Sequence, residues 1–144
     1  MNRITLILAT ALLVWGVIAC NNGGAKNEPL VGTHWKLMEL NGRPVKVGQN
    51  TPEPHIVLDS TTNRFNGNAG CNTFFGSYKL GEAGKITFSQ VAATRMMCLD
   101  MEVENLFLPV FESIDGYSIK GNELTFTDVS KSLLARFTAA PTPR

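Results

Sequence analysis

The segment at residues 66–78 reads N-G-N-A-G-C-N-T-F-F-G-S-Y, and a companion segment at residues 94–98 reads T-R-M-M-C. The first segment combines three glycines, three asparagines and one cysteine with Phe74, Phe75 and Tyr78. Glycine frees the backbone, asparagine amides bond turn backbone, and aromatic rings anchor a segment in a core. This combination indicates either a binding loop or a corner of a curved sheet.

The spacing of the glycines favours the corner. Gly67, Gly70 and Gly76 match neither G-x-G-x-x-G nor G-x-x-x-x-G-K-[ST], and a strand pattern follows them. A phosphate-binding loop is therefore not indicated. We expect these glycines to adopt positive φ or to allow a close crossing where the sheet bends.

The segments on either side of this corner have the alternation typical of strands. Asn41-Gly42 predicts a tight turn with a short return strand through Val45 and Val47. The longer predicted strands are residues 33–40, 55–59, 64–69, 73–80, 86–88, 117–120, 123–127 and 132–137.

One segment has a helical period. In residues 100–114 the apolar residues recur at helical spacing, with Asp100 as the expected N-cap and Pro109 as the expected site of a kink or break. Glu102 and Glu104 fall on its polar face, where we expect them to be solvated. The strands and this helix predict an α+β domain over residues 32–138. Its expected form is a strongly curved, barrel-like, mostly antiparallel sheet with one main α-helix packed on it.

The N-terminus resembles a bacterial lipoprotein signal. Arg3 precedes an apolar run that ends in V-I-A-C at Cys20, and this run is shorter than the ~20 residues that a membrane-spanning helix needs. We therefore expect a signal peptide at residues 1–19, diacylglyceryl and palmitate-type acylation of Cys20, and a flexible tether over residues 20–31. Residues 139–144, with two prolines, are the expected disordered tail.

The charge balance bears on possible partners, and the residue after Cys20 bears on location. The chain has 13 Lys plus Arg, 12 Asp plus Glu and a formal net charge of +1, so no concentrated basic patch predicts a nucleic-acid partner. Asn21 is not the Asp associated with inner-membrane retention in some bacteria. The expected location is therefore the cell envelope, lipid-anchored, with the periplasmic face of the outer membrane favoured.

The order of motifs resembles the META domain or HslJ-like family. The resemblance rests on N-G-x-P-V from residue 41, G-C-N-x-F-x-G-x-Y at residues 70–78, T-R-M-M-C at residues 94–98, and G-x-x-L-x-F at residues 121–126. It covers roughly residues 32–137. It implies a mainly antiparallel α+β fold in envelope or secreted proteins associated with heat shock and stress tolerance. It implies no established catalytic residues, and we expect no cofactor.

The two signature motifs contain Cys71 and Cys98. Outside the cytoplasm such a pair is a disulfide candidate, and the alternative is two buried reduced thiols. A catalytic thiol or a zinc site would need His34 or His55 beside them, but neither residue has the spacing of such a motif. We therefore predict no catalytic residues and no metal ligands.

A candidate binding groove remains beside the corner. Asn72 and Arg95 are its expected binding residues, although Arg95 could equally be solvated or paired with a carboxylate. Met96, Met97 and Met101 are expected mostly in the core, with a groove for a flexible partner as the alternative.

The function hypothesis is a non-enzymatic, monomeric envelope lipoprotein that binds an unknown envelope protein during stress. One alternative is a small-ligand or lipid carrier that uses the sheet interior, lined by Phe65, Phe75, Ile86 and Phe88. Another is a protease inhibitor with an exposed loop at residues 48–54.

Overall fold

The computed structural model describes residues 26–141. The expected signal peptide and Cys20 lie outside these residues, as do the last three. Within them, the strands are β1 (His34–Leu40), β2 (Arg43–Pro44), β3 (His55–Asp59), β4 (Arg64–Asn68), β5 (Thr73–Leu80), β6 (Ile86–Ala93), β7 (Gly116–Lys120), β8 (Glu123–Thr127) and β9 (Leu133–Ala140). The helical elements are η1 (Glu82–Gly84), α1 (Glu102–Phe107) and η2 (Leu108–Glu112).

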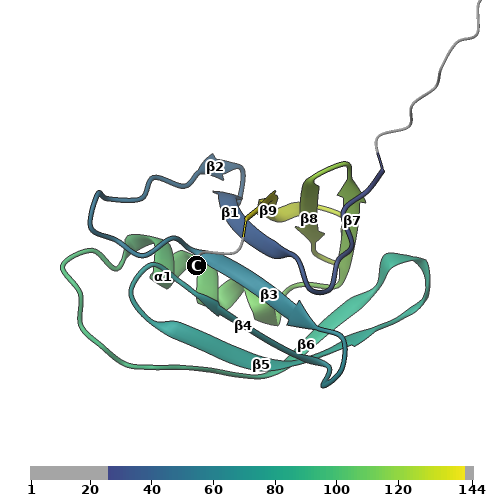
Figure 1. Ribbon diagram of the computed structural model, residues 1–144, viewed down its shortest axis with the longest axis horizontal. Coiled ribbons are helices and arrows are strands. Elements are labelled where there is room, and N and C mark those ends of the chain that lie inside the picture. The colour runs from purple at the N-terminus through teal and green to yellow at the C-terminus, as the bar shows by residue number, and fades with distance from the viewer. Residues whose placement is uncertain (1–25, 142–144) are drawn as a thin grey trace, which may run out of the picture.

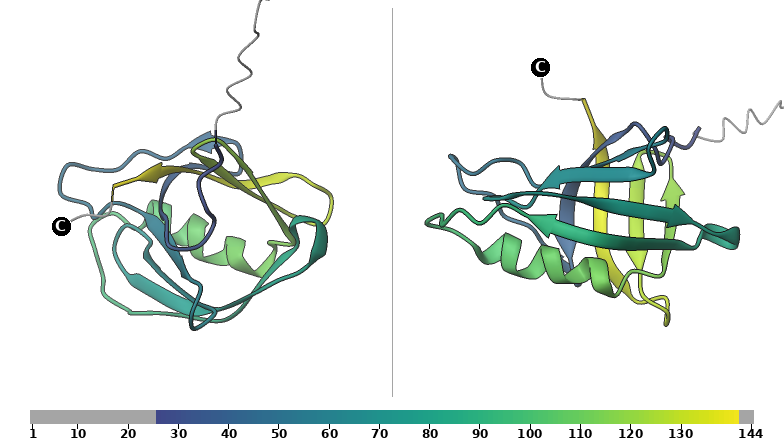
Figure 2. Two further views of the ribbon diagram at one scale, coloured as in Figure 1. Left: turned by 45° about the vertical axis from the view of Figure 1, so that its right-hand side comes forward. Right: turned by 90° about the horizontal axis from the view of Figure 1, so that it is seen from below.

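The strands form one antiparallel sheet that curls into a half-barrel (Figure 1). Its order is β6-β5-β4-β3-β1-β9-β8-β7, with β2 paired to β1. The two edge strands meet only at one end, where Lys85 bridges Gly116 and the amide of Ile86 donates to the carbonyl of Asp115. Farther along, α1 and η2 lie beside β6 on the open side (Figure 2). The predicted α+β class and curved antiparallel sheet are confirmed.

The helix breaks where the sequence predicts a break. The α-helical turns end at Phe107, and the chain continues as 3₁₀-helix with Pro109 near its start. The expected N-cap is one residue off, because α1 follows Met101 and not Asp100. Asp100 still accepts a hydrogen bond from the amide of Glu102, at 3.0 Å, so it stabilises the first turn.

Both ends of the domain extend beyond the expected limits. Ala139 and Ala140 belong to β9 and pair with β1, so the expected tail does not begin at residue 139. At the other end, Leu30 is buried and its carbonyl accepts a hydrogen bond from the Trp35 indole, at 2.9 Å. The last part of the expected tether, residues 27–31, is therefore packed against the domain. The limits of the domain are set by pairing with β1 at one end and by burial of Leu30 at the other, and the local sequence pattern indicates neither.

Aromatic side chains fill the concave face of the sheet. The cluster is a contiguous set of rings whose centroids lie 4.8–6.1 Å apart, in stacked, tilted and edge-on pairs. Its members are Phe65, Phe74, Phe88, Phe107, Phe111, Phe126 and Phe137. The expected interior residue Phe75 is not among them, because the strand register turns Phe74 inward and leaves Phe75 46% exposed.

Two glycines make room for these rings. A Cβ on Gly67 would overlap the carbonyl oxygen of His55 and lie 2.5 Å from the Phe74 ring. A Cβ on Gly76 would lie 2.6 Å from the Phe65 ring. The close crossing expected at the corner therefore occurs at these two positions, whereas Gly70 adopts a positive φ of 106°.

No helix in residues 26–141 is long and apolar enough to cross a membrane.

Gly67→Ala should lower the free energy of unfolding by about 1–3 kcal/mol, because the added methyl group meets backbone and a packed ring that cannot both move. Urea unfolding followed by tryptophan fluorescence would measure it. Gly48→Ala is the matched control, since its only close neighbour is the hydroxyl of Thr51. Equal losses in the two variants would contradict the packing role of Gly67.

Candidate functional site

A buried polar cluster centred on Asn72 joins the sheet corner to α1. The backbone amide and the Nδ2 of Asn72 each donate to one carboxylate oxygen of Glu104, both at 2.7 Å. Its Oδ1 accepts from the amide of Met96 at 2.7 Å and from the hydroxyl of Thr94 at 2.8 Å. Nδ2 also donates to the Met96 carbonyl, at 3.1 Å. One side chain thus fixes the corner, the segment after β6 and the helix relative to one another.

The structure corrects two expectations for this cluster. Asn72 is 1% exposed and uses its amide nitrogen and its oxygen within the protein, so it is not a ligand-binding residue of an open groove. Glu104 is 7% exposed, not solvated, because its partner lies 32 residues away in the sequence. The only local signal was the position of Glu104 in the first turn of the helix, and that signal does not name the partner.

A disulfide reinforces the same junction. Cys71 and Cys98 are joined, with their Cα atoms 6.0 Å apart and a sequence separation of 27. The Cys71 sulfur also lies 3.6 Å from the Met96 carbonyl oxygen. The segment 94–98 is therefore attached to the corner by a covalent bond and by the amide of Asn72.

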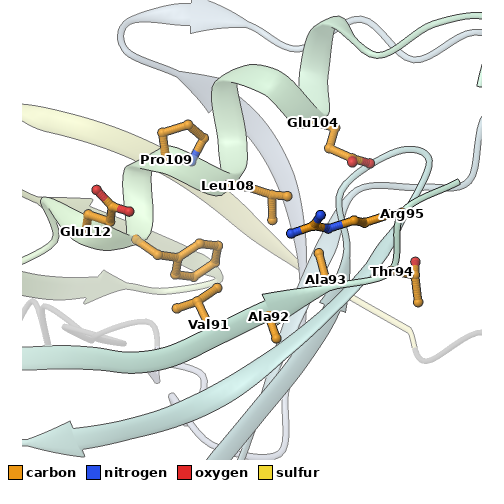
Figure 3. A pocket seen from close by; sticks show the side chains of 10 residues that line it. Val91, Ala92, Ala93, Thr94, Arg95, Glu104, Leu108, Pro109 and Glu112 are labelled. Carbon is orange, nitrogen blue, oxygen red and sulfur yellow. The ribbon is translucent and has the colours of Figure 1, made fainter. Parts of the chain in front are cut away.

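An open cleft of about 550 Å³ lies beside this junction (Figure 3). One wall is the end of β6, and the other is formed by α1 and η2. The lining residues are Val91, Ala92, Ala93, Thr94, Arg95, Glu104, Leu108, Pro109, Phe111 and Glu112. The cleft therefore has apolar walls and a small number of charged groups, a composition common to binding sites.

The charged side chains of the cleft differ in whether they are hydrogen-bonded within the protein. Arg95 extends beneath Leu108 between the strand and the helix, while Glu112 lies at the opposite end of the cleft (Figure 3). Within residues 26–141, no carboxylate forms an ion pair with Arg95 or accepts a hydrogen bond from it. Both oxygens of Glu104 are already hydrogen-bonded to Asn72. Of the two residues expected in a groove, Arg95 is thus the one that the cleft presents.

An exposed apolar loop continues from the cleft. Met96 is 58% exposed, Met97 is 92% exposed and Leu99 is fully exposed, and we call residues 96–99 the Met loop. The expectation that Met96 and Met97 lie mostly in the core is therefore wrong. Their backbone is held by Asn72 and the disulfide, so the side chains project outward from a fixed segment.

The two histidines form a separate structural cluster. The rings of His34 and His55 stack with centroids 4.2 Å apart, and Glu53 lies 3.1 Å from His34 Nε2 and 2.8 Å from Lys36 Nζ. Burial lowers the pKa of His55, against the hydrogen bond that its ring donates to the Glu53 carbonyl. Burial opposes ionisation of Glu53, but hydrogen bonds from Lys36 and His34 outweigh it and lower the pKa of this carboxyl.

Neither histidine lines the cleft, and both cysteines of the corner are in the disulfide. In the part of the chain that the structure describes, no three His, Cys, Asp or Glu side chains are grouped to hold a metal ion.

Known proteins resemble this chain along most of its length. A model of the META domain family matches residues 28–141. Heat shock protein HslJ of Escherichia coli (strain K12) is 26% identical over 136 residues, covering 92% of this chain and 94% of that protein. An NMR structure of a protein from Burkholderia xenovorans has a TM-score of 0.61 at 23% identity, covering 78% of this chain and 85% of that one. A DUF4847 family protein from Bacteroides vulgatus has a TM-score of 0.55 at 12% identity, covering 79% and 96%. These two structures share the fold.

Glu104→Gln should lower the free energy of unfolding by about 2–3 kcal/mol, because an amide nitrogen would then face a donor of Asn72 in a buried site. Glu112→Gln is the matched control on the same helical segment, where the carboxyl is exposed, and its effect should stay within about 0.5 kcal/mol. Urea unfolding measures both. Equal losses of unfolding free energy in the two variants would show that the Asn72–Glu104 hydrogen bonds contribute little to the stability of the fold.

Proposed function

The chain belongs to the META domain family, and from this premise we propose that it is a non-enzymatic lipoprotein of the cell envelope that binds a protein segment in the β6–helix cleft. Membership of this family suggests an envelope protein related to stress. The likeness to a heat shock protein of Escherichia coli supports a role during heat stress. The proposed location is the periplasmic face of the outer membrane.

This proposal rests on one observation: the open cleft lies at the surface, beside β6 and the helix, and not in the interior of the sheet. The interior of the sheet is filled by packed rings, and Phe65, Ile86 and Phe88 are buried among them. A carrier that encloses a small ligand or lipid needs a cavity there, so the packing opposes that alternative. The cleft, in contrast, is open at the surface beside the exposed Met loop. Such a site suits a segment of another chain.

The position of the N-terminal side of the domain supports the same proposal. Asn27 and Glu28 bond the backbone of Gly121 at the turn between β7 and β8. The loop that contains residues 96–99 projects from the opposite end of the domain (Figure 2). An acyl anchor on Cys20 would join the domain at the end away from the Met loop, which leaves that loop accessible to a partner in the aqueous compartment.

The protease-inhibitor alternative has no comparable support. Residues 48–54 lie in the loop between β2 and β3. The end of this loop is held by Glu53, which bonds His34 and Lys36, and by the buried Pro54. Protease inhibition by this loop stays a prediction from the sequence.

Acylation of Cys20 is tested by mass spectrometry of protein purified from membranes. We expect cleavage before Cys20 and an N-terminal peptide heavier by the mass of its acyl groups. Cys20→Ser is the control and should leave the chain without the acyl groups and with its apolar N-terminal segment uncleaved, because acylation of the cysteine precedes cleavage. Recovery of an unmodified, intact N-terminus from wild-type membranes would overturn the lipoprotein proposal.

Partner binding is tested by photo-crosslinking in intact cells, with a photoreactive amino acid in place of Val91 in the cleft. Val129→photoreactive residue is the matched control, since Val129 is exposed in the loop between β8 and β9, away from the cleft. We expect a discrete protein adduct from position 91 that increases under heat stress, is absent from position 129, and is lost when Arg95→Glu is added. Adducts with lipid only, or equal adducts from both positions, would contradict the proposal.

A further inference from the structure

The last part of β6 is an open sheet edge inside the cleft. The Thr94 amide donates to the carbonyl of Thr73 on β5, at 3.0 Å. In an antiparallel ladder, neighbouring residues point their N–H and C=O groups to alternate sides. The peptide groups of Ala93 therefore point away from β5, toward the cleft. Within residues 26–141, no backbone or side-chain group forms a hydrogen bond with these two groups of Ala93.

The last four residues of this edge contain no lysine, proline or bulge of the kind that blocks strand addition. Native proteins protect sheet edges with lysine, proline, bulges or a covering element. Near its start, β6 is covered by the Lys85–Gly116 bridge, and a bulge at Gln90 follows, with φ of 54°. Residues 91–94 read V-A-A-T, which has no charge and no proline. Small side chains at Ala92 and Ala93 also allow another backbone to approach closely.

We propose that this edge of β6 receives an extended peptide segment as an added antiparallel strand, with an apolar residue against the helical wall and an acidic residue beside Arg95. The proposal rests on the proposed function of the cleft and specifies the partner. Backbone pairing supplies affinity in this mode, and the pockets beside the strand supply specificity.

The chemistry of the cleft sets the pattern of the segment. Leu108 and Phe111 of η2 line the cleft as an apolar wall across from β6. Arg95 and Glu112 lie at opposite ends of the cleft, so the complementary segment has an acidic residue at one end and a basic residue at the other (Figure 3). An antiparallel strand runs against β6, which places its N-terminal end beside Arg95. The expected motif is therefore acidic, then alternating β-branched residues, then basic.

The probe is a capped peptide with the sequence D-V-T-V-T-K, added to the full chain purified in detergent. We expect saturable binding by isothermal titration calorimetry, together with slower hydrogen exchange of the Ala93 amide. Of two versions of this peptide, N-methylated at the third or at the fourth residue, one should bind about tenfold more weakly or worse, because alternate amides of an added strand face β6. Unchanged affinity of both methylated peptides, or no binding of the unmodified one, would overturn the proposal.

Ala93→Pro tests the protein side of the same ladder. Proline is tolerated on an edge strand where its nitrogen faces outward, so this variant should keep the fold while removing the donor. Ala93→Ser keeps the amide and is the matched control. With thermal unfolding checked for both, we expect the peptide to lose at least about tenfold in affinity for Ala93→Pro only.

The outcomes separate this proposal from the broader one. If Ala93→Pro retains peptide affinity while position 91 still crosslinks a protein, strand addition is wrong and the cleft remains a binding site. If position 91 gives no protein adduct, the proposed function itself fails. A concentration-dependent dimer in sedimentation experiments that Ala93→Pro abolishes would assign the edge to a second copy of this chain, and would also overturn the proposal.

Discussion

The bonds between Asn72 and Glu104 determine how the open side of this sheet is closed. A buried carboxylate needs donors for its oxygens, and Asn72 supplies one from its backbone and one from its side chain. Because the oxygen of the same amide binds Met96 and Thr94, the position of the helix is fixed relative to the end of β6. The width of the cleft follows from this polar junction and not from the aromatic core alone.

The core and the junction have different roles. The rings of Phe74, Phe107 and Phe111 contact one another across the sheet and the helical segment, which stabilises the fold without defining a single position for the helix. Hydrogen bonds have stricter geometry than apolar contacts, so the junction selects one arrangement among several that the core would accept. The disulfide at Cys71 limits the motion of the segment 94–98 further.

Local patterns predicted the fold class but not the junction. The helical period, the break at Pro109 and most strands depend on neighbours in sequence, and they are confirmed. Adjacent Phe74 and Phe75 are equally apolar, so the inward one is decided by a register that the sheet fixes. Glu104 was expected in solvent, because helical periodicity assigns a face and cannot identify a partner 32 residues earlier. For Cys71 and Cys98 the sequence left two redox states open.

The surroundings of the β6 edge limit which segments can pair with it. An uncharged strand edge that is fully accessible could pair with any exposed strand and lead to aggregation. Here the helical wall stands opposite the edge, so a whole sheet cannot approach it and a single extended segment can. The charges of Arg95 and Glu112 then disfavour segments of the wrong polarity. An edge restricted in this way can stay open for binding because the junction at Asn72 holds its surroundings in place.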